Sequence, residues 1–205
     1  MRCINCGAFS LRMICATCAA NLAECRLSMR QVEGFSVFYY YGYSEIRELI
    51  LSKHHEYGAT VLARIASLSL AKFPLHLQRE ISANPQNYET FKTDGIFKFN
   101  AVPLDDDARS GYSHTAILAR ALKSELVEPK FHCLRAQNRV KYTGQSLEFR
   151  LKHKRNFKIL TPPKFPVILV DDIITSGLSM LQARESLIDG GFMPVCGLVL
   201  ANAKE

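Results

Sequence analysis

The chain has 205 residues, of which 48% are hydrophobic and 22% are charged. This is the composition of a globular protein, and it excludes the disordered, fibrous and membrane-spanning classes. The formal net charge of +7 raises the question of an anionic partner, but the charge is concentrated in one stretch. Residues 130–164 hold ten Lys and Arg against a single acid, Glu148, so the other 170 residues sum to −2. A uniformly basic protein is therefore excluded.

The N-terminal cysteines predict a metal site. Seven cysteines, an odd number, fit poorly with a fully paired disulfide framework. Four of them form two Cys-x-x-Cys pairs, Cys3 with Cys6 and Cys15 with Cys18, and two such turns bring four thiolates to one centre. We expect a structural zinc knuckle over residues 1–30, with redox-active pairs or buried thiols as the alternative. Three further cysteines are expected to be small core side chains: Cys25, Cys133 and Cys196.

The sequence also limits the location of the protein. No apolar run approaches the ~18 residues that a transmembrane helix needs, so we do not expect an integral membrane protein. Residues 1–22 contain four cysteines and no sustained apolar segment of the kind found in secretory signals. With thiols that are metal-bound or free, this pattern favours a cytoplasmic protein.

The elements that follow the knuckle are mostly helical. Hydrophobic spacing and β-branched or aromatic runs predict the following, in chain order: a helix at 16–27, a strand of a hairpin at 35–43, helices at 46–53 and 61–71, and a polar loop at 82–93. The run Tyr39–Tyr41 could act as a base-stacking platform, but we favour packing in the core or on an edge strand.

From residue 96 onward, strands and helices alternate. The predicted elements are a strand at 96–102 ending at Pro103, a helix at 114–122, a short strand at 131–134, a buried strand at 167–170, a helix at 180–188 closed by Gly190-Gly191, and a strand at 194–200. Such alternation indicates a parallel sheet with crossover helices. We therefore expect an α/β domain over residues 31–205.

The segment 167–179, VILVDDIITSGLS, predicts a phosphate site. Ligands of open α/β sheets bind at the carboxyl ends of strands, and backbone N–H groups at a helix N-terminus cradle phosphate. Asp171 and Asp172 are expected to accept hydrogen bonds from sugar hydroxyls, while Gly177 permits close backbone approach. The alternative is an N-capped helix after a sheet edge. No Walker A lysine pattern supports hydrolysis of a nucleoside triphosphate.

This thirteen-residue string resembles, at every position, the 5-phosphoribosyl-1-pyrophosphate (PRPP) signature of type I phosphoribosyltransferases. The resemblance implies that fold, with a mobile hood, Mg²⁺ bound with PRPP, and PRPP-binding residues Asp171, Asp172, Ile173, Ile174, Thr175, Ser176, Gly177, Leu178 and Ser179. With the knuckle added, the chain resembles the ComF family of competence proteins (ComFC type). The looser similarities are Tyr41-Gly42, Leu49-Ile50, Lys53, Val102-Pro103-Leu104, Gly111-Tyr112 and Leu118-Ala119.

The segment that resembles the pyrophosphate loop departs from the family. Its candidates are Pro103, Leu104 and Arg109, but residues 105–107 are three aspartates where basic residues are expected. These acids would repel pyrophosphate unless Mg²⁺ screens them, and a solvated acidic turn is the favoured interpretation. His114 is interpreted as an ordinary helix-start residue rather than a catalytic one.

The basic stretch occupies the position of the hood, residues 136–156. Its candidate contacts to phosphate or nucleic acid are Arg139, Lys141, Tyr142, Arg150, Lys152, Lys154 and Arg155. A solvated basic face is the plain alternative. Ten cations exceed what one pyrophosphate requires, and interleaved aromatics suit a single strand of nucleic acid. The family resemblance implies that this partner is single-stranded DNA.

Three functions remain open at this point. The resemblance implies a competence protein that binds PRPP and single-stranded DNA during DNA uptake in natural transformation, with DNA-uptake or recombination proteins as further partners. The alternatives are an active phosphoribosyltransferase that moves ribose 5-phosphate to an unidentified acceptor base, and a PRPP-sensing regulator without turnover. The altered pyrophosphate loop and the lack of a recognisable base-binding element count weakly against turnover.

Overall fold

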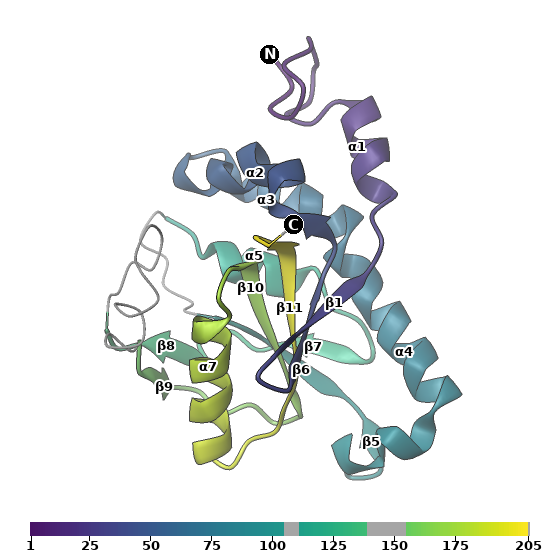
Figure 1. Cartoon of the computed structure of the whole chain (residues 1–205), viewed down its shortest axis with the longest axis vertical. Helices are drawn as coiled ribbons and strands as arrows, with labels where there is room; N and C mark the ends of the chain where they lie inside the picture. The colour runs from purple at the N-terminus through teal and green to yellow at the C-terminus, as the bar shows by residue number, and fades with distance from the viewer. Residues whose placement is uncertain (105–110, 139–154, 205) are drawn as a thin grey trace.

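The computed structural model describes residues 1–104, 111–138 and 155–204. In this part of the chain a mostly parallel sheet lies between helices, as Figure 1 shows, so the expected mixed α/β class is confirmed. The strand order is β1-β2-β11-β10-β6-β7. The bounds are β1 Ser28–Val32, β2 Phe35–Tyr39, β6 Phe99–Pro103, β7 Val127–Pro129, β10 Val167–Ile174 and β11 Pro194–Asn202.

Only one pairing in this sheet is antiparallel, the hairpin of β1 with β2. The four other pairings in that order are parallel, with β10 at the centre between β6 and β11. The short strand β3 (Tyr41–Gly42) adds to the end of β11. Because β10 has neighbours on both sides, its carboxyl end lies in the middle of the sheet edge.

The sheet is buried on both faces, as the continuous apolar run at 167–170 predicts. Along β10, Val167 and Leu169 belong to one core cluster while Ile168 and Val170 belong to the other. This alternation is the two-residue period of a strand. The central strand therefore connects two separate hydrophobic layers.

The first layer packs against most of the helices. They are α1 Ala16–Ala23, α2 Tyr43–Leu51, α3 Gly58–Leu68, α4 Phe73–Ala83 and α5 His114–Arg120, joined in part by the short 3-10 turns η1 Ser52–His54 and η2 Leu70–Lys72. The second layer packs against α7 (Leu178–Asp189) and against the small hairpin of β8 (Leu134–Ala136) with β9 (Phe157–Ile159).

Several predicted boundaries in the first half are wrong. The helix predicted at 16–27 ends at Ala23, because the chain must extend for β1 to pair with β2. The helix predicted at 61–71 ends at Leu68, where buried Ser69 leaves helical geometry. The loop predicted at 82–93 starts later, because α4 runs to Ala83 and is followed by the 3-10 turns η3 Pro85–Asn87 and η4 Glu89–Phe91.

Two strand predictions in the second half also need correction. The strand predicted at 96–102 is split: β5 (Ile96–Phe97) pairs with β4 (Lys92–Thr93), and only β6 joins the sheet. The strand predicted at 131–134 is wrong, since His132 has a left-handed φ of 54° and turns the chain. The edge strand is β7 instead, three residues long and interrupted by Pro129, a pattern too short to stand out in sequence.

Candidate functional site

Asp171 and Asp172 lie within the central strand, not after it. We expected the strand to end at residue 170, but β10 continues to Ile174 and pairs Ile173 with Ala201 of β11. Asp172 is only 6% exposed, whereas Asp171 is half-buried. The Asp172 N–H donates to Asp171 Oδ1 at 2.8 Å, so the two carboxyl groups are held as a unit.

The chain turns sharply from β10 into α7. Gly177 adopts a left-handed φ of 86°, and a Cβ there would lie 2.5 Å from Val32 Cγ1. The glycine is therefore required by the turn and by the close approach of the β1–β2 hairpin. Leu178 begins α7, so residues 175–179 form the N-terminus of a helix of twelve residues. Figure 1 shows this N-terminus beside the carboxyl end of β10.

The hairpin also fastens this loop by hydrogen bonds. Arg30 Nη1 on β1 donates to the Thr175 carbonyl oxygen at 2.8 Å and to Asn202 Oδ1 at 3.3 Å. These contacts join a strand near the N-terminus to a turn 145 residues further on. No local signal in the sequence pointed to Arg30.

Lys53 is the partner of Asp172. Its ammonium group donates to Asp172 Oδ2 in a buried ion pair that joins residues 119 apart in the sequence. The Tyr112 hydroxyl donates to the Lys53 carbonyl oxygen at 2.9 Å, which holds the backbone of η1 over the site. In the sequence Lys53 stood out only through the family resemblance, and its spacing gave no indication of an ion pair.

Two further basic side chains, those of His114 and Arg155, belong to this site. His114, the first residue of α5, has Nε2 at 4.0 Å from Asp172 Oδ2. The Arg155 guanidinium acts electrostatically on Asp171, and the Arg155 backbone N–H donates to Gln182 Oε1 on α7 at 2.9 Å. His114 is thus at a helix start as expected, but it also faces the acid pair. Among the predicted hood cations, Arg155 is one that the structure describes, and it lies beside the predicted acids.

The two carboxyl groups of the acid pair have very different pKa values. Burial and the neighbouring carboxylate of Asp172 raise the pKa of Asp171 to about 8. Burial opposes ionisation of Asp172 as well, but Lys53 and His114 outweigh it and lower the pKa of Asp172 to about 2. Asp172 in turn raises the pKa of Lys53 in spite of burial. At neutral pH one carboxyl group is therefore ionised and paired, while the other is mostly protonated.

The remaining predicted site residues fall into two groups. Pro103 ends β6, and the Leu104 N–H donates to the Val170 carbonyl oxygen at 2.8 Å with its side chain in the core. These two residues build the strand end rather than an open loop. The following predictions lie outside the described residues: the aspartates at 105–107, Arg109, Arg139, Lys141, Tyr142, Arg150, Lys152 and Lys154. Tyr39, Tyr40 and Tyr41 are each at most 7% exposed, so core packing is confirmed and a base-stacking platform there is wrong.

The four N-terminal cysteines meet at one point, as predicted. The sulfur atoms of Cys3, Cys6, Cys15 and Cys18 all lie within 4.8 Å of one another, close enough to bind one metal ion and compatible with a structural zinc. Cys6 Sγ and Cys15 Sγ are 3.8 Å apart, which is about the edge of a tetrahedron built on Zn–S bonds of ~2.3 Å. Gly7 makes the expected turn with a φ of 73° and donates to the Cys3 carbonyl oxygen.

The thiols of the cluster differ in how readily they ionise. Burial opposes ionisation of Cys3, but backbone N–H donors outweigh it and lower the pKa of Cys3 to about 6. Although the Asn5 side chain favours the Cys18 thiolate, burial and the neighbouring thiols raise the pKa of Cys18 to about 12. Burial and mutual repulsion thus oppose the ionisation of all four thiols together, and a metal ion bound between them would favour the thiolate forms. Of the other cysteines, Cys133 and Cys196 are core residues as expected, while Cys25 is half-buried.

No protein-family model matches this chain, and no curated protein matches it. Within residues 1–104, 111–138 and 155–204, no helix combines the length and apolar character needed to span a bilayer.

Proposed function

We propose that this chain binds PRPP at the carboxyl end of β10. The observation that carries the proposal is the meeting of two acids, a helix N-terminus behind a glycine turn, and the cationic side chains of Lys53 and Arg155 from two other segments. Carboxyl groups suit sugar hydroxyls, backbone N–H groups suit a phosphate ester, and Lys or Arg suit a diphosphate. PRPP carries all three groups on one ribose.

Each part of the ligand has a partner in this arrangement. The ribose hydroxyls bind Asp171 and Asp172, and the 5-phosphate binds the N–H groups of residues 175–179 at the start of α7. Lys53 pairs with Asp172, and Arg155 acts electrostatically on Asp171; both cations would bind the diphosphate.

The charge of the site supports an anionic ligand. With the pKa of Asp171 raised to about 8, the acid pair carries about one negative charge at pH 7, balanced by Lys53. Arg155 and the helix dipole of α7 then leave an excess of positive charge.

Two metal ions belong to the proposal. His114, Asp171 and Asp172 offer ligand atoms within 4.8 Å of one another, a donor set that suits a divalent cation. Mg²⁺ bound there with PRPP would screen the charge of the diphosphate. At the N-terminus, four thiolates leave no open position, so the metal is a structural zinc rather than a catalytic one.

Calorimetry with PRPP and Mg²⁺ tests the site. Asp171→Asn and Asp172→Asn keep the shape of each side chain, and together they are expected to weaken PRPP binding at least about tenfold. Asp189→Asn, at the exposed end of α7, is the matched control and should leave the affinity unchanged. If the double variant binds PRPP as tightly as the unmodified protein, the site assignment is wrong.

The cations at the site favour a second candidate function. This is the transfer of ribose 5-phosphate to an acceptor base on a type I phosphoribosyltransferase fold. Lys53 and Arg155 would stabilise the diphosphate as it leaves and the ribose becomes oxocarbenium-like. Incubation with PRPP, Mg²⁺ and a panel of bases and oligonucleotides tests it, since release of pyrophosphate with one acceptor demonstrates turnover. No release with any acceptor favours PRPP sensing.

The sequence resemblance is the basis for proposing that the chain belongs to the ComF family. The same resemblance supports single-stranded DNA as a partner and a cytoplasmic role in natural transformation. The predicted DNA contacts lie mainly in residues 139–154, outside the described residues. A salt titration of single-stranded DNA binding tests them. Affinity should fall steeply with salt, and less steeply after Lys152, Lys154 and Arg155 are neutralised together. A flat titration would contradict the DNA role.

A further inference from the structure

An exposed aromatic pair lies in the connection between α2 and α3. The rings of His55 and Tyr57 are stacked, with centroids 5.1 Å apart and planes 5° from parallel. His55 is exposed and Tyr57 is 39% exposed, and neither residue belongs to the two core clusters. The pair therefore does little for the packing of the core, although its geometry is well defined.

The backbone around the pair is fastened tightly. The His55 N–H donates to the Ser52 carbonyl oxygen at 2.8 Å, and the Gly58 N–H donates to the His55 carbonyl oxygen at 3.0 Å. A Cβ on Gly58 would lie 2.1 Å from the Ser52 oxygen and 2.3 Å from the Tyr112 hydroxyl. Because this turn is already ordered, a ligand that stacks on it loses little free energy in ordering the protein.

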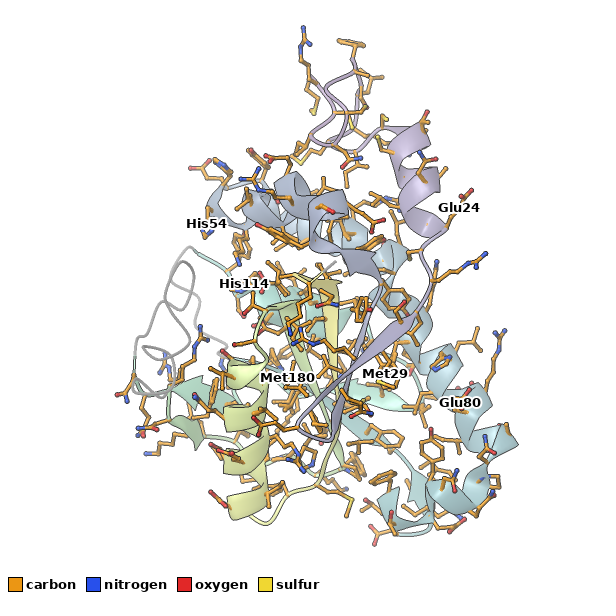
Figure 2. All side chains as sticks on the ribbon, viewed as in Figure 1. Glu24, Met29, His54, Glu80, His114 and Met180 are labelled. Carbon is orange, nitrogen blue, oxygen red and sulfur yellow. The ribbon has the colours of Figure 1, made fainter. Side chains whose placement is uncertain are left out.

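The same turn reaches the acid pair. Lys53, two residues before His55, forms the ion pair with Asp172, and Tyr112 holds the Lys53 carbonyl oxygen. Tyr112 is itself two residues before His114, which faces Asp172. Figure 2 shows His54, in this turn, on the same side of the molecule as His114. The aromatic pair and the proposed ribose site are thus parts of one connected structure.

We propose that His55 and Tyr57 form a stacking subsite for a planar nitrogen-containing ring of the nucleobase type, beside the bound ribose phosphate. This inference rests on the proposed function, because the ribose site gives the ring its neighbour. Flat aromatic faces bind bases by stacking, and the ring nitrogens of His55 add a polar edge. Two side chains are too few for a protein interface, which needs about 1,000 Å².

A nucleobase ring can reach this subsite either as a free base or as part of an oligonucleotide. The chain contains no tryptophan, so Tyr57→Trp creates a single fluorescent reporter at the subsite. Adenine is one titrant, and a short oligodeoxyadenylate is the other. Leu75→Trp is the matched control, because Leu75 is 52% exposed on α4, outside this turn and outside the basic stretch 130–164.

Saturable quenching of Tyr57→Trp emission, absent in Leu75→Trp, is the expected result. Adding His55→Ala to Tyr57→Trp should weaken the affinity about fivefold or more, while Tyr57→Phe should bind like the unmodified protein in calorimetry. Quenching by adenine alone assigns the subsite to a free base, and quenching by the oligonucleotide alone assigns it to a strand. Equal or absent quenching in both tryptophan variants overturns the proposal.

Calorimetry with PRPP on the same variants separates the two proposals. PRPP binding without selective quenching leaves the ribose site and removes the stacking subsite. Quenching without PRPP binding keeps the subsite and removes the ribose phosphate site beside it.

Discussion

The cysteine cluster and the acid-pair site are assembled in opposite ways. All four sulfur atoms of the cluster come from residues 3–18, so local turns alone bring them together. At the acid pair, Lys53 reaches Asp172 across 119 residues of sequence, and Arg30 reaches Thr175 across 145. A local site depends on its own ligands, whereas the long-range site depends on the whole sheet being in register.

Removing the metal from the cysteine cluster is expected to have the largest effect on stability. A structural zinc contributes on the order of 10 kcal/mol to the folding of small metal-bound units. Chelation, or Cys18→Ser, should therefore unfold residues 1–23 and leave the central strands protected. Hydrogen exchange measures both regions at once.

Cys25→Ser is the control for the cysteine substitution, since Cys25 is half-buried and outside the cluster. Loss of protection in β10 and β11 together with residues 1–23 would show that the two regions are not independent. The distinction between a local and a long-range site would then fail.

The next largest effect concerns the buried ion pair. Lys53→Met leaves Asp172 without its cation, and it should lower the free energy of unfolding at neutral pH by about 2 kcal/mol. Lys92→Met is the matched control, because Lys92 pairs with Glu89 three residues away on the surface and such pairs contribute less than about 1 kcal/mol. Urea unfolding measures both. Equal losses would mean that the long-range pair matters no more than the local one.

Lys53→Met should also change how the free energy of unfolding depends on pH. In the native protein the pKa of Asp172 is lowered to about 2, against 3.8 as its ordinary value. Its contribution to stability is therefore complete above about pH 4 and is lost as the pH falls from 4 to 2. In Lys53→Met this loss should disappear, because the pKa of Asp172 is no longer lowered by the ammonium group.

The fold was predictable where the pattern is local and strong. The apolar run at 167–170 placed the central strand and its burial on both faces, and Gly190 closes α7 as the sequence indicated. The edge strand β7 was missed because three residues ending in Pro129 are too few to show the alternation of apolar and polar side chains that marks a strand. The end of β10 was placed four residues too early, because the acids look like a strand end although β11 pairs on to Asn202.

The site was predictable only in its local half. The string at 171–179 indicated the acids and the helix start, since those residues are contiguous in sequence. Lys53, Arg30 and the orientation of His114 depend on how three other segments reach the sheet, and no spacing in the sequence encodes that. Gly177 was expected to make room for a phosphate, but the structure shows that it also makes room for Val32.

The smallest expected effect concerns Arg30, which we expect to position residues 175–179 for PRPP binding while contributing little to the stability of the fold. Arg30→Gln removes the cationic donor to Thr175, and PRPP binding should weaken about threefold to fivefold while stability changes by no more than about 1 kcal/mol. Arg30→Lys should recover part of the affinity, because an ammonium group can still donate to the Thr175 oxygen. Arg26→Gln, an exposed neighbour on the same connection, is the control. Calorimetry and urea unfolding decide the matter: unchanged affinity in Arg30→Gln would mean that residues 175–179 hold their shape by local contacts alone, as the cysteine cluster does.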